Sequence, residues 1–171
     1  MQNKAMKNII YLLDNILKNA LIFLMVALVV SVSWQVVSRY VFSSPSSWTE
    51  EVARFLLIWI GVLGAAYAFR TGVHLGLDLL PKKLSGNAAH TLKLFTLLVV
   101  AGFSVAVLII GGGSLVALTW ELKQYSAVLG LPIAFIYSVI PTTGVLICFY
   151  AIAAAMGEEL CEPEDSAQPG S

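Results

Sequence analysis

The charged residues of this chain are confined almost entirely to short gaps between long apolar stretches. Twenty uncharged residues separate Lys18 from Arg39, and a further uncharged run of 15 residues extends from Phe55 to Phe69. Two longer runs, of 27 and 34 residues, end before Glu121 and Glu158. Since a transmembrane helix needs about 20 apolar residues, this pattern predicts an all-α membrane protein with four transmembrane helices.

The composition supports this prediction. Hydrophobic residues make up 58% of the 171 residues and charged residues only 12%, with a mean hydropathy of +0.85, whereas soluble domains carry about 25% charged residues. We expect one transmembrane domain over residues 1–157 and an acidic, disordered tail over 158–171. The expected spans are about 19–42, 50–70, 93–120 and 127–156.

Two features should modify the regular helices. Apolar residues between Ile9 and Leu17 recur at helical spacing, which predicts an amphipathic extension before the first span. Helix from about Met6 to Phe42 would exceed the bilayer core, so it must tilt or lie partly along the interface. In the fourth span, Pro132 should lie near the helix start and Pro141 should kink the helix. The nearby threonines 142 and 143 could then satisfy the freed carbonyls.

The distribution of lysine and arginine predicts the orientation. The N-terminal segment and the second connection carry seven of these residues, whereas the first and third connections carry two or three. Because the positive side of a membrane protein faces the cytoplasm, we expect both termini inside. The seven are Lys4, Lys7, Lys18, Arg70, Lys82, Lys83 and Lys93.

Charges gather where the second span begins. Ser47, Trp48, Thr49 and Glu50 fit a capping box with Ser47 as the N-cap, and Glu50, Glu51 and Arg54 have the spacing of helical ion pairs. One interpretation is a well-capped helix start at the outer interface, with Trp48 as an interfacial aromatic residue. The alternative is that Arg39, Glu50, Glu51 and Arg54 form an ion cluster against another subunit.

Small residues mark possible helix-packing faces. Gly61, Gly64, Ala65 and Ala68 share one face of the second span, and Gly102, Ala106, Gly113 and Ala117 a face of the third. Such faces let another helix approach closely, either within the chain or from a partner.

The chemistry that is missing from the sequence narrows the function. No acidic residue lies in the core of a span, so no proton or sodium relay is predicted. The two histidines share one connection and the two cysteines lie far apart, so we expect no metal, cofactor or disulfide. The net charge of zero gives no reason to expect nucleic acid. We predict an accessory or scaffold subunit rather than an enzyme.

An ordered set of short motifs resembles the small membrane subunit, of the DctQ or SiaQ type, of TRAP (tripartite ATP-independent periplasmic) transporters. The resemblance extends roughly from Leu21 to Ala155. Its motifs are Arg39-Tyr40-Val41-Phe42, Trp48-Thr49-Glu50-Glu51, Arg54, Trp59, Gly64, Arg70-Thr71-Gly72-Val73-His74 and Asp78-Leu79-Leu80.

The resemblance implies a fixed scaffold subunit in the bacterial inner membrane. Its partners would be a large membrane subunit, which holds the substrate and sodium sites, and a periplasmic binding protein. Uptake would be driven by sodium, and the substrates would be carboxylates such as C4-dicarboxylates or sialic acid. Candidate interface or structural residues are Arg39, Trp48, Glu50, Glu51, Arg54, Gly61, Gly64, Arg70, His74 and Asp78.

Other four-span proteins fit the sequence less well. A small multidrug exporter would need an acidic residue inside its first span, and a quinone or haem protein would need histidines in facing helices. A disulfide-forming enzyme would need cysteine pairs. The chain has none of these features. A small multidrug exporter or an accessory subunit of another membrane complex is kept as the alternative function.

Overall fold

The computed structural model describes residues 2–42, 44, 46–71 and 87–155, and over these it is helical without a strand. The elements are α1 (Gln2–Tyr40), α2 (Ser47–Arg70), α3 (Asn87–Phe103), η2 (Ser104–Gly111), α4 (Gly112–Glu121), α5 (Ile133–Tyr137) and α6 (Val139–Ala155). Four helical segments are long and apolar enough to cross a membrane, Lys7–Tyr40, Ser47–Arg70, Leu94–Glu121 and Ile133–Ala155. The predicted all-α membrane fold is therefore confirmed. His74, Asp78 and the acidic tail lie outside the described residues.

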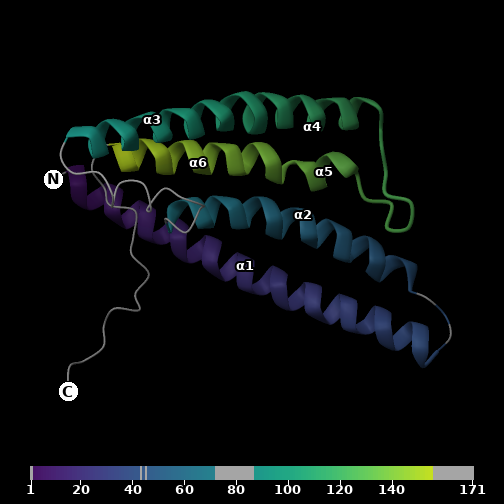
Figure 1. Cartoon of the computed structure of the whole chain (residues 1–171). Coiled ribbons are helices and arrows are strands. Elements are labelled where there is room, and N and C mark those ends of the chain that lie inside the picture. Colours follow the sequence, from purple (N-terminus) through teal and green to yellow (C-terminus); the bar gives the residue numbers. More distant parts are fainter. Residues whose placement is uncertain (1, 43, 45, 72–86, 156–171) are drawn as a thin grey trace, which may run out of the picture.

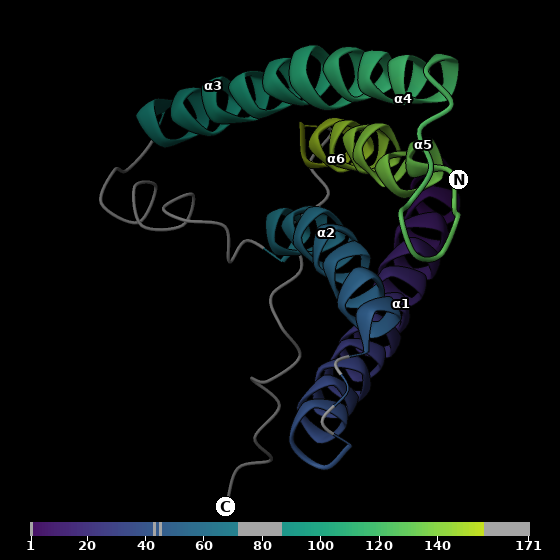
Figure 2. The same cartoon turned by 90° about the vertical axis from the view of Figure 1, so that its right-hand side faces the viewer.

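The helices are arranged as two antiparallel pairs (Figure 1). The first pair is α1 and α2, and the second is the rod of α3, η2 and α4 with α5 and α6 alongside. Figure 2 shows, from a second side, that α6 lies between the rod and α2. The N-terminus, the end of α2, the start of α3 and the end of α6 lie at the same end, called here the N-terminal end; the opposite end is called the far end.

Helix α1 is a single helix of 39 residues. At 1.5 Å per residue it is about 58 Å long, well beyond the ~30 Å thickness of a bilayer core. It contains neither glycine nor proline, so nothing in the sequence interrupts its backbone ladder. Ile10 and Leu17 are buried near its start, and most of the apolar side chains that follow are exposed, as expected for a helix in lipid.

The third span contains a π-helical segment, η2 (Ser104–Gly111). Helix α6 fits closely against this segment. The Ser104 hydroxyl donates a hydrogen bond of 3.0 Å to the carbonyl of Gly144, and a Cβ atom on Gly144 would lie 2.8 Å from side-chain atoms of Leu108 and Ile109. Only a residue without a Cβ atom lets α6 lie this close to η2. The distance between the two helices therefore depends on glycine at position 144.

The fourth span is interrupted between α5 and α6. Proline at 141 has no N–H to donate to the carbonyl four residues earlier, at Tyr137, and the first helical segment ends there. Thr142 does not supply the predicted repair of this carbonyl. Its hydroxyl donates a 2.8 Å hydrogen bond to the Ser138 carbonyl, which already accepts the Thr142 N–H at 3.3 Å. The buried hydroxyl of Thr143 has no partner among the described residues.

Helix α5 begins at Ile133, later than the expected start near residue 127. Gly130 adopts a φ of +65°, which favours glycine, and Pro132 precedes the first helical residue. Between them and α4 the chain turns back on itself. Ser126 N–H donates to the Leu131 carbonyl (2.8 Å), and Ile133 N–H to the Gln124 carbonyl (3.0 Å). These bonds hold residues 122–132, called here the α4–α5 loop, in a compact turn.

The buried core lies towards the N-terminal end, where α1, α2, α3 and α6 meet. Its fully buried members come from all four helices and include both large and small side chains. They are Leu17, Ala66, Phe69, Leu97, Ile147, Tyr150, Ala151 and Ala154.

Candidate functional site

The carboxylate of Glu51 joins the start of α2 to the α4–α5 loop. It accepts hydrogen bonds from three successive backbone N–H groups, those of Ala127 (3.1 Å), Val128 (3.1 Å) and Leu129 (2.9 Å). The Ser126 side chain also contacts the carboxylate, and Glu51 is only 9% exposed. Three amide donors satisfy a buried charge without a cation, so this carboxylate holds the loop against α2.

Trp59 makes a second connection between the same elements. Its indole N–H donates a 3.1 Å hydrogen bond to the carbonyl of Ile136 in α5, and its ring lies against Phe135 with centroids 6.2 Å apart. Glu51 and Trp59 are eight positions apart on α2, about two turns. Together they fix the far half of α2 to α5 and to the preceding loop, and we call this arrangement the Glu51 cluster.

The predicted capping box is wrong. Helix α2 begins at Ser47, and its N-cap is Ser46, whose side chain makes no capping hydrogen bond. The Thr49 hydroxyl instead donates to the Ser46 carbonyl at 2.9 Å. Because Glu51 faces the α4–α5 loop, it is not available as a partner for Arg54.

The other charges predicted near this end stay apart. Within the described part of the chain, Arg54 pairs with Glu50 alone, at 3.4 Å, and both side chains are about two-thirds exposed, 66% and 69%. Arg39 and Trp48 are also exposed, and among the described residues Arg39 has no ion pair. The chain therefore does not assemble Arg39, Glu50, Glu51 and Arg54 into one cluster.

A buried ion pair lies at the N-terminal end, and sequence reasoning missed it. Arg70, the last residue of α2, donates from Nε to Oδ2 of Asp14 in α1 at 3.1 Å. Their side chains are 8% and 22% exposed. The Arg70 guanidinium also lies 5.8 Å from the centroid of the Tyr150 ring in α6, a cation–π distance. Arg70 was predicted only as a topology and interface residue.

Tyr150 completes this group, which we call the Arg70 cluster. Tyr150 is 1% exposed, and its hydroxyl interacts electrostatically with Asp14. Neither that hydroxyl nor Oδ1 of Asp14 has a hydrogen-bond partner in the described part of the chain. The cluster therefore joins α1, α2 and α6 through one cation, one carboxylate and one aromatic ring.

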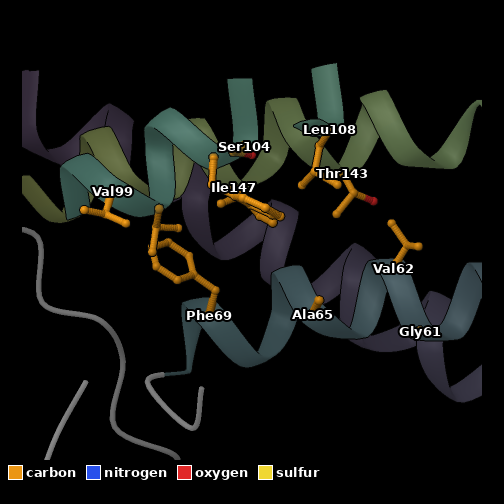
Figure 3. Close-up of a pocket in the computed structure, with 11 residues that line it drawn as sticks. Gly61, Val62, Ala65, Phe69, Val99, Ser104, Leu108, Thr143 and Ile147 are labelled. Atoms are coloured by element: carbon orange, nitrogen blue, oxygen red, sulfur yellow. The ribbon is translucent and has the colours of Figure 1, made fainter. Parts of the chain in front are cut away.

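A cavity of about 430 Å³ lies between the two clusters. Figure 3 shows its walls, with α2 on one side and α3, η2 and α6 on the other. Among the residues that the structure describes, none that lines it is charged. The lining residues are Gly61, Val62, Ala65, Phe69, Val99, Val100, Phe103, Ser104, Leu108, Thr143 and Ile147.

None of the glycines in the predicted small-residue faces, which are Gly61, Gly64, Gly102 and Gly113, lies at a close contact with another part of the described chain. A Cβ atom on Gly61 or Gly64 would have no neighbour within 4 Å, so no other described helix packs against these two glycines. The glycines at close contacts are Gly112, near Ile140 and Pro141, and Gly144. The sequence could have suggested Gly112 through its run of three glycines, but Gly144 had no pattern around it.

The Glu51 cluster, the Arg70 cluster and the apolar cavity are typical of a structural support rather than of a reaction centre. Helix α2 is fixed at its far end by Glu51 and Trp59 and at its N-terminal end by Arg70. The charged groups that are buried in the described residues are used in these connections. The space that remains between the helices is apolar.

Comparisons with known proteins agree with this geometry. Residues 28–160 match the family described as tripartite ATP-independent periplasmic transporters, DctQ component. A TRAP transporter small permease protein of Haemophilus influenzae is 28% identical over 142 residues, which cover 83% of this chain and 86% of that protein. The sialic acid TRAP transporter small permease protein SiaQ of Vibrio cholerae is 28% identical over 154 residues, covering 87% and 83%.

Two further relatives match over shorter stretches. The C4-dicarboxylate TRAP transporter small permease protein DctQ of Rhodobacter capsulatus is 32% identical over 115 residues, covering 64% of this chain and 48% of that protein. The sialic acid TRAP transporter permease protein SiaT of Haemophilus influenzae is 41% identical over 54 residues, covering 29% and 9%. With a family match that spans most of its length, this chain belongs to the DctQ component family of tripartite ATP-independent periplasmic transporters.

Proposed function

We propose that this chain is the small scaffold subunit of a sodium-driven uptake system for carboxylates. A large permease subunit would carry the substrate, and a periplasmic binding protein would deliver it. The observation that carries the proposal is the family match over residues 28–160. The match of 54 residues to the permease protein SiaT supports the partnership, because similar sequence occurs there within a permease chain.

The internal geometry supports a scaffold rather than a carrier. A carrier needs charged or polar groups that face a substrate path near the middle of the membrane. In the described spans, Glu51 and Arg70 lie near opposite ends of α2 and are engaged by other parts of the chain. The described residues that line the cavity between them are all uncharged. The sodium and substrate sites are therefore assigned to the large partner.

The relatives favour sialic acid as the substrate to test first. The relative named for sialic acid, SiaQ, aligns with 87% of this chain. The relative named for C4-dicarboxylates aligns with 64% of it. Both substrates are carboxylates, so we propose the class for this chain and sialic acid within it.

The exposed residues at the far end are the proposed contacts to the partners. Arg39, Trp48 and the Glu50–Arg54 pair have no role in packing the described helices together. Two further groups are added to these proposed contacts. Gly61 and Gly64, further along α2, have open space around them, and His74 and Asp78, in the connection after α2, are added from the sequence alone. We further propose that both termini lie in the cytoplasm, which places Arg39, Trp48, Glu50 and Arg54 on the periplasmic side.

Reconstitution tests the proposed function. The chain should be purified alone, and together with a TRAP permease and a periplasmic binding protein from the same organism, and placed in liposomes with labelled sialic acid outside. We expect sodium-dependent uptake only with all three proteins, and none with this chain alone. A matched set with labelled succinate tests the substrate. Sodium-driven uptake by the chain alone, or full uptake without it, would contradict the scaffold role.

A further inference from the structure

We propose that the first turns of α1, residues 7–18, form a surface that binds anionic phospholipid, separately from any contact with the transport partners. Helix α1 is continuous through this segment, so successive side chains project about 100° apart around it. Ile10 and Leu17 lie on one side and are buried. Two sides of the segment remain exposed, and they differ in chemistry.

The first exposed side is apolar. Ile9, Leu12 and Ile16 follow the i, i+3, i+7 spacing of one helix face, and each is more than half exposed. These side chains are large and aliphatic, and α1 contains no glycine. Close packing of one helix on another in a membrane favours small residues. This side is therefore better suited to lipid chains than to a helix of a partner.

The second exposed side is polar and positively charged. Lys7 and Lys18 are both exposed and lie eleven positions apart, so they share a face at a separation of about 16 Å. Neither lysine has an ion pair within the described residues. Asp14, the one acid in this segment, accepts a hydrogen bond from Arg70 at 3.1 Å. The charge that remains for a ligand is positive, which matches an anionic headgroup.

The Asp14–Arg70 pair indicates the depth of this segment, because Arg70 ends the second span. Lys7 is seven residues before Asp14, about 10 Å of helix, and the headgroup layer of a bilayer is about 5–8 Å thick. Because α1 slants across the other helices (Figure 1), the segment rises through this layer by less than its own length. Tyr11 is 77% exposed at this level, where tyrosine is common in membrane proteins. Apolar and cationic sides at this depth are the arrangement of a helix that lies in the interface.

Energy transfer to labelled lipids tests the preference for anionic headgroups. In the full-length chain without Cys148 and Cys161, a donor dye would be attached to Asn8→Cys, which is exposed beside the lysines. Phosphatidylcholine vesicles would contain a trace of acceptor-labelled phosphatidylglycerol or, in a matched set, of acceptor-labelled phosphatidylcholine. We expect phosphatidylglycerol to be enriched at least about threefold near the donor. Equal transfer to the two lipids would overturn the proposal.

Glutamine variants identify the groups responsible. Lys7→Gln combined with Lys18→Gln keeps two exposed side chains that favour helix and should remove the enrichment. Lys123→Gln removes an exposed lysine at the far end and should leave the enrichment unchanged, which controls for net charge. Higher salt should weaken the enrichment in the parent chain. An enrichment that survives both the double substitution and high salt does not arise from these lysines, and the proposal is then wrong.

Spin labels test how the segment lies in the membrane. Ile9→Cys and Asn8→Cys are neighbours in depth but project to different sides of α1. A label at Ile9 should collide mainly with dissolved oxygen, and a label at Asn8 mainly with a water-soluble nickel chelate. If the chelate reaches both labels equally, the helix projects into water, which the proposal does not allow.

The large permease provides the last arm of the test. Adding a TRAP permease from the same organism should leave the Ile9 label open to oxygen and the preference for phosphatidylglycerol in place. Shielding of the Ile9 label would mean that a protein segment covers the apolar side, and it would contradict binding to lipid there.

Discussion

At the scale of single residues, two adjacent carboxylates at the start of α2 have different roles. Glu50 is 69% exposed and faces Arg54, an arrangement that contributes only about 0–1 kcal/mol. Glu51 is buried and accepts three backbone N–H groups from the α4–α5 loop. The helical spacing of these residues predicts the first contact, because both partners lie on one helix. The second depends on a turn 76 to 78 positions away, which no local pattern indicates.

The Arg70 cluster was beyond sequence analysis for the same reason. Arg70 and Asp14 are 56 positions apart, and the helical spacing around Asp14 indicates only that it lies on the polar face of an amphipathic helix. Only the antiparallel packing of α1 on α2 turns that face towards Arg70. The sequence gives the residue types but not the register that brings them together.

The Asp14–Arg70 pair yields a prediction about stability. Arg70→Met should lower the free energy of unfolding by about 3–5 kcal/mol, because it leaves a partly buried carboxylate without its cation. Circular dichroism in mixed detergent micelles, titrated with dodecyl sulfate, measures the change. Asp14→Leu combined with Arg70→Met should recover part of the loss, since it removes the unpaired charge. If Arg70→Met alone unfolds like the parent chain, the pair is effectively solvated.

At the scale of elements, the sequence predicts the disruption of helices better than their contacts. Pro141 predicts a disruption of the fourth span, and α5 ends at Tyr137, the residue whose carbonyl Pro141 cannot pair with. The π-helix η2 (Ser104–Gly111) has no comparable signal in the sequence. The contact that involves η2 is with α6, whose backbone lies close to η2 at Gly144.

This close approach predicts opposite effects for two glycine substitutions. Gly144→Ala should destabilise the chain by about 1–3 kcal/mol, because its Cβ would lie 2.8 Å from Leu108 and Ile109 and force α6 away from η2. Gly113→Ala meets nothing within 4 Å and should stabilise α4 by up to ~1 kcal/mol through helix propensity. Unfolding in the same mixed micelles compares the two. If the two variants are equally stable, α6 can move away from η2 without a loss of folding free energy, and the prediction is wrong.

At the scale of the whole molecule, apolar run length was enough to predict the architecture. Four runs predict four spans, and the four apolar helices and the family together make this a multi-pass protein of the bacterial inner membrane. The length of an apolar run does not predict which helices are neighbours. The buried residues Leu17 and Leu97 are no more apolar than the exposed residue Phe95. Helix pairing is fixed by the glycine contacts and by the two polar clusters, each of which joins distant segments.

The orientation of the whole molecule is the last prediction, and it depends on charge alone. The N-terminal segment, the connection between α2 and α3 and the two helix ends that flank this connection carry seven lysines and arginines, so the N-terminal end should face the cytoplasm. In a variant without Cys148 and Cys161, a cysteine would be placed at Asn8 or at Gln124, both exposed. A membrane-impermeant maleimide should label Gln124→Cys in intact cells and Asn8→Cys only after the inner membrane is opened. The reverse pattern would place the far-end residues Arg39, Glu50 and Arg54 in the cytoplasm, where they could not meet a periplasmic partner.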